Sequence, residues 1–417
     1  MLMQLFIKEC RQTAGSLVFW LTVLILLFVY ASQLGGMEIK AQPEPGQGEY
    51  GWQISHDPET IMQSALGKLT EEYYWENYTT YPIGFYKNVT LNDEENRRIG
   101  EILKETTGIG SREEAGSVIE AWYGDFWMTE NVTPDMVYPG ELKVEPAEGL
   151  TYERFIQRME ETDRILGGGS HYSKQNCEQM VKVPMTYEDA AREYENLKKE
   201  DRLTGGYARL FCDYMGIFLG VLPVFLAVAR GLRDRRARMQ ELIYTRKCGS
   251  FTVIASRYLA MVVMLLLPVL ALSVIPLGKC ASYAQGAGIA VDMLAFVKYI
   301  LGWLLPTIMI VVALGMFLTE LTDTAAAVLA QGAWCFAAVF TGVMSLTGGR
   351  YGWNLVPRHN TEMNWQGFHD GFAQLAANRI LYASAALVLV ALTAFLYSQK
   401  REGRLNIRGK ILADRKG

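Results

Sequence analysis

The sequence has few cysteines and lacks the short motifs of several large enzyme classes. Its 417 residues include six cysteines, and Cys177 is the only one between residues 37 and 206, so that long segment holds no internal disulfide. No G-x-x-x-x-G-K-[ST] sequence is present, which excludes nucleotide binding by a P-loop. Neither H-E-x-x-H nor a pair of C-x-x-C sequences occurs, so these common zinc motifs are absent as well.

Charge is distributed very unevenly along the chain. Residues 37–206 carry 33 acidic and 17 basic side chains, a net charge of −16, whereas the remaining residues carry 11 acidic and 23 basic side chains, a net charge of +12. The overall net charge of −4 therefore conceals two parts of opposite character. Half of all residues are hydrophobic and they gather in long runs. This distribution argues against a nucleic-acid-binding protein, a disordered chain and a disulfide-rich secreted module.

Six long runs contain no charged residue at all. A helix rises about 1.5 Å per residue, so about 20 residues cross the hydrocarbon core of a membrane. A charge at the bilayer centre costs about 2.5–3.5 kcal/mol, so uncharged runs of this length predict membrane-spanning helices rather than the buried helices of a soluble protein. The runs are residues 12–37, 214–229, 258–278, 299–319, 324–349 and 380–399.

The first two runs allow more than one interpretation. The first follows Lys8 and Arg11, as in a signal peptide, but Leu17–Leu34 exceeds a usual apolar h-region and no clear small-x-small cleavage site follows. We therefore expect it to be a retained span. The second run is short, with Arg209 and Asp213 near its outer end. We expect these two charges to reach outward to water from the membrane interface.

Lysine and arginine predict the orientation in the membrane, because short basic loops remain cytoplasmic. Bases precede the first run, fill the segment between the second and third runs, and follow the sixth run. With six spans these three segments lie on one side. Both termini are therefore predicted to be cytoplasmic in a multi-pass protein of the cell membrane. The acidic residues 37–206 and the loops at 278–297 and 348–378 are then extracellular.

Residues 37–206 are long enough to form a domain with its own core. Helix-capping patterns predict that this domain is mainly helical, with strands in short stretches such as Ile83–Val89. Its many aromatic residues indicate either a ligand-contacting surface or, as we favour, a core with few aliphatic side chains. The helix signals are Asn92 or Asp93 before residues 94–107 with Gly108 at their end, Ser111-x-x-Glu114, Tyr152–Leu166 followed by Gly167–Gly169, and Thr186-x-x-Asp189 opening a helix that Gly205-Gly206 would hinge to the second span.

One predicted outer loop holds residue types that serve in metal and acid–base sites. His359 and His369 lie in the 348–378 segment together with Glu362 and Asp370. These side chains are compatible with a zinc site or an acid–base pair in a polytopic membrane enzyme. Two histidines so spaced in an irregular segment are more typical of ordinary polar loop residues, which is the interpretation we favour.

The basic segment between the second and third runs has a helical pattern. Met239, Leu242 and Ile243 recur at helical spacing while arginines dominate the other faces, and Gly249-Ser250 follows before the third run. Two interpretations remain open from these residues alone. The segment either rests on anionic lipid, at about 1 kcal/mol per base near the surface, or docks a soluble cytoplasmic partner.

The order of these features along the chain is also informative. An amphipathic start (Met1–Thr13) leads into the first span, a large outer insertion follows, and the second span ends in R-x-x-R-x-R-R-x-R-M-x-E-L-I-Y, which corresponds to Arg230–Tyr244. This layout resembles the permease subunits of type-2 ABC exporters, although the acidic insertion departs from the family pattern. The S-x-x-x-I-x-x-x-[KR]-Y element of many such permeases is similar to Ser250, Ile254, Arg257 and Tyr258.

The resemblance implies that the chain is an all-α membrane protein and the transport subunit of an ATP-driven exporter, not an enzyme. Residues 231–253 would form a coupling segment that docks on a separately encoded ABC ATPase, two copies of which bind ATP and Mg for the complex. A second copy of the permease, or a paralogue, would complete the unit within the lipid bilayer, and no cofactor or nucleic acid is expected for this chain. The implied ATPase-coupling residues are Arg235, Arg236, Arg238, Met239, Glu241, Leu242, Ile243 and Tyr244.

The predicted organisation places a mainly helical extracellular domain between the first two of six transmembrane helices. An alternative from the same layout is a membrane-anchored sensor or receptor whose extracellular domain binds a ligand without transport. The predicted boundaries are 1–14 for the connecting helix, 15–36, 207–230, 254–277, 298–319, 325–347 and 379–398 for the transmembrane helices, 37–206 for the extracellular domain, 231–253 for the coupling segment, 278–297 and 348–378 for the outer loop and the re-entrant segment, 320–324 for a cytoplasmic turn and 399–417 for the cytoplasmic tail.

Overall fold

The protein folds into two compact units, as seen in a computed structural model that describes residues 2–82, 86–124, 140–237, 244, 248–343, 348–349 and 351–404. One unit, termed the bundle, joins Met1–Pro43 to Ala191–Gly417, and the other, termed the insert, is Glu44–Ala190. The insert is shorter at both ends than the predicted domain 37–206. The reason is that the chain on either side of it makes hydrogen bonds to the bundle.

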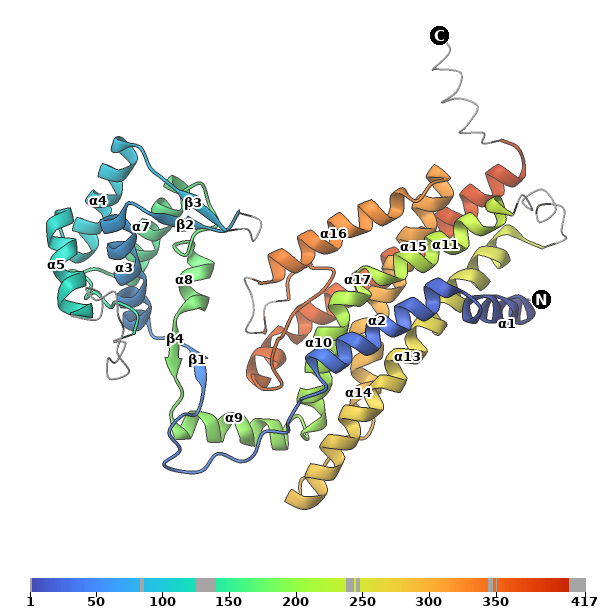
Figure 1. The fold of residues 1–417 in the computed structure, drawn as a ribbon, viewed down its shortest axis with the longest axis horizontal. Helices are drawn as coiled ribbons and strands as arrows, with labels where there is room; N and C mark the ends of the chain where they lie inside the picture. The colour runs from blue at the N-terminus through green and yellow to red at the C-terminus, as the bar shows by residue number, and fades with distance from the viewer. Residues whose placement is uncertain are drawn as a thin grey trace, which may run out of the picture. The chain divides into compact units, whose positions relative to one another are not determined.

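The bundle consists of helices, most of them rich in leucine, valine and alanine (Figure 1). A helix satisfies its own backbone hydrogen bonds, which is what an apolar segment requires when it leaves water. Helix α9 begins in the insert and ends in the bundle. The helices are α1 (Leu2–Ala14), α2 (Leu17–Gln33), α9 (Tyr187–Lys199), α10 (Thr204–Leu219), α11 (Leu222–Arg236), α13 (Ser250–Ala287), α14 (Ala295–Tyr299), the π-helical turn η2 (Ile300–Leu304), α15 (Leu305–Thr322), α16 (Ala326–Val343) and α17 (Trp365–Arg401).

Three helical stretches are long and apolar enough to cross a membrane: α13, the continuous Ala295–Thr322, and α17. The number rises to five if each of two bent helix pairs is a single span. These pairs are α1 with α2, bent by 66°, and α10 with the start of α11, bent by 41°. The apolar part of α16, Ala326–Val339, is shorter. The chain is therefore a mainly helical protein with three to five candidate membrane-spanning helices, where the sequence predicted six.

Two helices of the bundle are much longer than the uncharged runs that predicted them. Helix α13 continues past Lys279 to Ala287, and Gly288, whose φ of +67° suits glycine, caps its end. Helix α17 begins at Trp365, where the Asn364 side chain accepts a hydrogen bond from the amide of Gly367. Much of the predicted loop 278–297 and of the re-entrant segment 348–378 is therefore helical. A charged residue limits an apolar run but does not end a helix, whereas caps do.

Helix α15 is the central helix of the bundle. It packs against α10, α11, α13, α16 and α17, and side chains such as Ile308, Val311 and Val312 are fully buried (Figure 1). Helix α1 packs on α13, and α2 packs on α10, α11 and α13. The outer faces of α2, α13 and α17 keep large apolar side chains exposed, among them Phe28 and Phe395. This pattern of a buried centre and an exposed apolar periphery is typical of a helix bundle surrounded by lipid.

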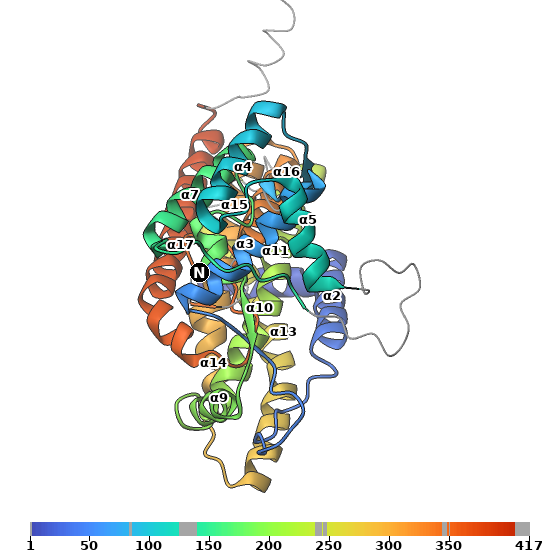
Figure 2. The same ribbon diagram turned by 90° about the vertical axis from the view of Figure 1, so that its left-hand side faces the viewer.

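The insert is a smaller mixed unit with its own hydrophobic core. Helix α3 packs against α4, α5, α7 and α8. Helices α4, α5 and α7 are seen around α3 in Figure 2. Strand β1 pairs antiparallel with β4, and β2 pairs antiparallel with β3. The elements are β1 (Trp52–Ile54), α3 (Pro58–Trp75), β2 (Tyr78–Thr80), β3 (Lys87–Val89), α4 (Asp93–Thr107), α5 (Arg112–Tyr123), α7 (Tyr152–Ile165), α8 (Lys174–Met180) and β4 (Lys182–Pro184).

The predicted helix signals of the insert are confirmed. Asn92 and Glu95 form a capping box at the start of α4, and Gly108 ends that helix with a φ of +84°. Ser111 accepts a hydrogen bond from the amide of Glu114 at the start of α5. Residues 167–169 all have positive φ and stop α7, a conformation that glycine adopts without steric cost. Local capping chemistry thus placed these helix ends correctly.

Two local predictions for this part of the chain failed. The longest helix of the insert, α3, was not predicted, although Asp57 caps it and Pro58 occupies its first turn, both ordinary start signals. The predicted hinge at Gly205-Gly206 is wrong, because both glycines lie inside α10. The chain instead breaks at Arg202 and Leu203, whose φ values are +46° and +60°.

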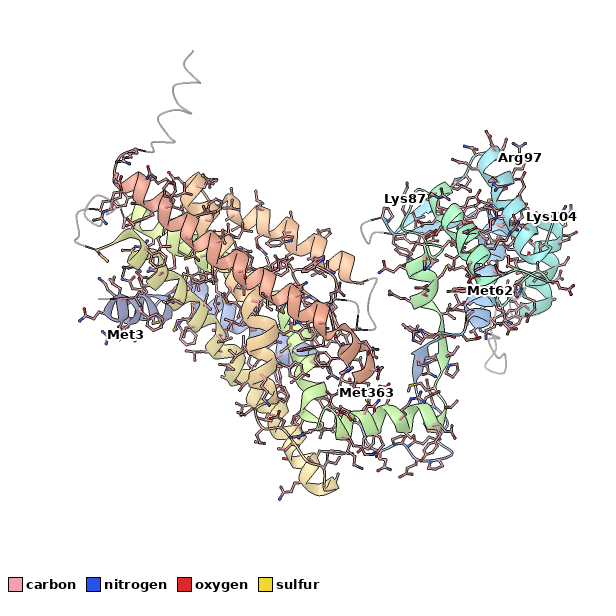
Figure 3. All side chains as sticks on the ribbon, turned by 180° about the vertical axis from the view of Figure 1, so that it is seen from behind. Met3, Met62, Lys87, Arg97, Lys104 and Met363 are labelled. Atoms are coloured by element: carbon pink, nitrogen blue, oxygen red, sulfur yellow. The ribbon has the colours of Figure 1, made fainter. Side chains whose placement is uncertain are left out.

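The aromatic residues of the insert divide between core and surface. Tyr78 and Tyr172 are fully buried, whereas the side chains of Trp52, Trp75 and Tyr86 are more than half exposed. Met62, labelled in Figure 3, belongs to the buried core, while Arg97 and Lys104 on α4 are exposed. Part of the aromatic content therefore lies in the core, as we favoured, and part lies on the surface.

Candidate functional site

The predicted ATPase-coupling residues lie largely outside the described residues. Five of the eight lie outside the residues that the structure describes: Arg238, Met239, Glu241, Leu242 and Ile243. Arg235 and Arg236 form the end of α11. Tyr244 is described, and its ring packs edge-on against Tyr397 of α17 with centroids 5.4 Å apart.

Arg401, near the end of α17, donates hydrogen bonds to two backbone carbonyls of the coupling segment. Its Nε donates to the carbonyl of Tyr244 at 2.8 Å, and its Nη1 donates to the carbonyl of Cys248 at 2.5 Å. Two residues within the coupling segment, Tyr244 and Cys248, are therefore held by the end of α17.

A buried ionic cluster joins α1 to both helices that flank the coupling segment. Glu9 of α1 forms ion pairs with Arg230 of α11 and with Arg257 of α13, the latter at 3.5 Å between Oε1 and Nε. Arg230 also donates to the side chain of Gln12 at 2.8 Å. The three charged side chains are 8–14% exposed. We call Glu9, Gln12, Arg230 and Arg257 the Glu9 cluster.

A small cavity lies beside the Glu9 cluster. Arg230, Arg257 and Glu320 line it together with apolar side chains of α13 and α15. Lys400 of α17 is bound to Asp323 at 2.6 Å and to Glu320 at 3.5 Å. Polar contacts therefore join α1 to α11 and α13 and, separately, α17 to the end of α15, and charged residues of both sets line the same cavity.

A second buried ionic cluster lies in and around α10, and it corrects a sequence prediction. Arg209 and Asp213 were expected to reach outward to water, but both are 0% exposed. Arg209 is bound by the carboxylate of Asp201, with Nη2 at 2.6 Å from Oδ2, and its guanidinium lies 4.6 Å from the ring centroid of Phe368. A buried charge requires such partners, because the loss of hydration is otherwise uncompensated.

Asp213 has equally complete partners. Its carboxylate accepts from Nε of Arg358 at 2.9 Å and from the backbone amide of His359 at 2.8 Å. Both donors come from the irregular chain before α17, so one side chain of α10 holds that segment. We call Asp201, Arg209, Asp213 and Arg358 the Arg209 cluster.

Sequence reasoning also missed Arg379, a buried cation of α17. Its guanidinium donates to the hydroxyl of Thr307 at 2.8 Å and to the carbonyls of Trp303 and Leu355 at 3.2 Å. The signal was present, because a charge directly before an apolar run is either at the water boundary or buried with partners. Sequence alone does not distinguish these cases, since the partners come from distant segments.

The four polar residues of the outer loop do not form one site. His359 is fully buried, with Nδ1 2.9 Å from the hydroxyl of Tyr351 and Nε2 3.0 Å from the carbonyl of Met363. His369 instead stacks on the Trp365 ring. Glu362 pairs with Lys40, and Asp370 accepts from Gln366. In the described residues, no group of three or more His, Cys, Asp or Glu side chains is arranged to hold a metal ion.

The insert contains a buried polar pair of its own. Glu72 on α3 accepts a hydrogen bond from the hydroxyl of Tyr172 at 2.6 Å. Burial raises the pKa of Glu72, and the hydrogen bond from Tyr172 opposes part of that increase. Burial also lowers the pKa of the neighbouring His171 to about 4, so this imidazole is neutral at pH 7. Burial raises the pKa of the Cys177 thiol to about 12, so it is not a reactive thiolate.

The fold and these clusters define a class of protein: a mainly helical chain with three to five candidate membrane-spanning helices, interrupted by a separately folded insert. No protein family, curated protein or solved structure matches the chain.

Proposed function

We propose that the chain is the membrane-spanning permease subunit of an ATP-driven ABC exporter. It lies in the cell membrane with six spans, both termini in the cytoplasm and the insert outside. Energy comes from a separate ABC ATPase that docks on residues 231–253, and a second permease copy completes the transport unit. The reasons are the charge distribution, the order of segments and one contact in the structure.

The Glu9 cluster is the observation that carries this proposal. Arg230 directly precedes the coupling segment and Arg257 lies four residues after its end, and both pair with the same carboxylate of α1. A displacement of residues 231–253 therefore acts on α1 as well as on α11 and α13. Because these pairs are buried, breaking them is costly, so we expect the connection to persist when the segment moves.

The bases of the coupling segment provide the test. We would purify the full chain from membranes of its native host and identify co-purifying proteins by mass spectrometry. Wild type is expected to retain an ABC-type ATPase, and replacement of Arg235, Arg236 and Arg238 by glutamate should reduce its recovery at least about tenfold, equivalent to about 1.4 kcal/mol of binding.

A matched control replaces three exposed lysines of the insert, Lys104, Lys174 and Lys182, by glutamate. This variant changes the net charge equally and should leave the recovery unchanged. The proposal is wrong if wild type retains no ABC-type ATPase, or if the arginine variant retains as much as wild type does.

A membrane-anchored receptor is the second candidate, and the exposed aromatic residues of the insert favour it. Trp52 is 60% exposed, Trp75 51% and Tyr86 65%. Exposed tryptophan and tyrosine supply much of the energy at binding surfaces. This function predicts a ligand that binds the insert equally well in membranes with and without an ABC-type ATPase, and no transport.

A further inference from the structure

The two chain segments that connect the insert to the bundle both contact one short stretch that precedes α17. Lys40, in the first connection, forms an ion pair with Glu362 at 2.8 Å. Glu193, in the second connection, accepts a hydrogen bond from the backbone amide of Asn364 at 2.8 Å. We call residues 358–364 the clasp, and Met363, labelled in Figure 3, marks its place at the start of α17.

The clasp is fixed to the bundle more firmly than to the connections. Arg358 and the amide of His359 bind the buried carboxylate of Asp213 on α10. Arg209 of α10 donates to the carbonyl of Glu362 at 3.3 Å. Asn364 caps α17, so the clasp continues directly into that helix. The position of the clasp therefore depends on the positions of α10 and α17.

The packing between the second connection and the clasp leaves no free space. A Cβ atom placed on Gly206 would lie 2.3 Å from the carbonyl oxygen of Glu362 and 2.6 Å from the side chain of Leu197. Leu197 belongs to α9 and Gly206 to the first turn of α10. Only glycine permits this approach, so α9, α10 and the clasp are in close contact at this point.

The first connection is an irregular stretch of chain. Residues 42–48 read QPEPGQG and form no helix or strand, and their two prolines restrict the backbone. Residues 35–40, which precede this stretch, bind side chains of the bundle. Lys279 donates to the carbonyls of Gly35 and Met37, the Lys40 amide donates to the hydroxyl of Tyr207, and the Lys40 side chain reaches Glu362.

We propose that the clasp transmits the binding of a ligand on the insert to helices α10 and α17, through the contacts of Glu362 with Lys40 and of the Asn364 amide with Glu193 of α9. This inference does not depend on whether the chain is an exporter or a receptor. Removal of the Lys40–Glu362 pair is expected to leave the protein folded, because the Lys40 side chain is 56% exposed and solvent screens the pair, although Glu362 is 13% exposed. The Asp213–Arg358 pair is buried and serves as the fixed end.

The experiment measures hydrogen exchange in the full chain in lipid nanodiscs, with and without antibody fragments raised against residues 44–190. In wild type, binding is expected to change exchange at least about threefold in residues 351–379 and in α10, because local opening there depends on the clasp. The double variant Glu362→Ala with Glu193→Ala should lose this response and still bind the fragments.

Two further variants separate transmission from general damage. Glu195 lies on α9 two positions from Glu193, but it pairs only with Lys198 and Lys199 among the described residues. Glu195→Ala should therefore keep the full response. Exchanging the charges, Lys40→Glu with Glu362→Lys, should restore a response that Glu362→Lys alone reduces.

Three results would overturn the proposal. One is an unchanged exchange in α10 and α17 of wild type with every fragment that binds. Another is a response in the double variant equal to that of wild type, which would mean that the signal takes another route. The last is an equal loss in Glu195→Ala, which would show that any change on α9 has this effect.

Discussion

The insert and the bundle use the same pairs of residue types in different ways. In the insert, Arg98, Arg158 and Glu161 form ion pairs whose side chains are 25–40% exposed. In the bundle, the Arg209–Asp201 and Arg358–Asp213 pairs are at most 8% exposed. Solvent screens the first kind, so each pair contributes about 0–1 kcal/mol. The second kind is costly to form, and its disruption leaves a buried charge without a partner.

This difference follows from where each unit places its apolar side chains. The insert has a water-facing surface around an aliphatic and aromatic core, so its stability comes from apolar burial and its charges remain outside. The bundle has apolar surfaces on its periphery as well, so apolar contact alone does not specify which helix packs where. Buried polar contacts such as Asn378 to the carbonyl of Gly352 supply that specificity.

Disruption of the Arg209 cluster should have the largest effect on stability. Asp213→Ala leaves Arg358 buried without its carboxylate and should cost about 3–5 kcal/mol. Hydrogen exchange in α10 and residues 351–364 of the full chain would measure this loss. Glu105→Ala in the insert removes an acceptor of two arginines at a partly exposed site and should cost about 1 kcal/mol or less. Equal costs at the two sites would remove the distinction between insert and bundle.

Apolar side chains should show the reverse contrast. Phe155 is 0% exposed in the core of the insert, and Phe155→Ala should destabilise the insert by about 3–4 kcal/mol because it leaves a cavity. Phe395 on α17 is 59% exposed, and Phe395→Ala should change stability in nanodiscs by less than about 1 kcal/mol, because lipid fills the space. Denaturant titrations that follow exchange in each unit would compare them. A large cost for Phe395→Ala would instead place a protein partner on that face.

The sequence predicted the insert's helix ends better than the interior of the bundle, for a physical reason. Capping depends on residues within four positions of each other, so Asn92, Glu95 and Gly108 carry the information locally. The partners of Arg209 and Asp213 include residues 8 and 145 positions away. No local pattern states whether such a charge faces water or a distant carboxylate.

The same limit applies to the candidate sites. The basic character of residues 230–257 is visible in the sequence, and it is the basis for predicting a coupling segment there. The role of Glu9 was not visible, because a lone acid in an amphipathic helix is ordinarily solvated. The two histidines were grouped because they are near in sequence, yet His359 points into the bundle core and His369 stacks on a neighbouring turn of α17. Proximity in sequence is a poor guide inside irregular chain.

Acid should destabilise the insert through the buried side chain of His171. The pKa of His171 is about 4 in the folded insert and 6.5 ordinarily, because burial disfavours its charged form. Between these values the unfolded chain binds a proton that the folded chain does not, so the free energy of unfolding falls as pH drops from 6.5 to 4.

His171→Gln should remove about 2–3 kcal/mol of this pH dependence. Burial raises the pKa of Glu72, so that carboxyl acts in the opposite direction, but it is present in both proteins and cancels in the difference. Exchange of insert peptides at several pH values would measure the slope. Identical slopes in wild type and variant would contradict the assignment, and a change in bundle peptides would show that the two units do not respond separately.

The smallest expected effect tests whether local capping stabilises the insert as an independent unit. Asn92 accepts hydrogen bonds from the amides of Glu94 and Glu95, and its own amide donates to the Glu95 carboxylate. Asn92→Ala should cost about 1 kcal/mol, and Asn92→Ser should cost much less, since serine caps equally well. The loss should appear throughout α3, α4 and α7, which share one core, and not in α15 or α17. An effect confined to the first turn of α4 would mean that the insert does not unfold cooperatively, and the comparison with the bundle would then hold only helix by helix.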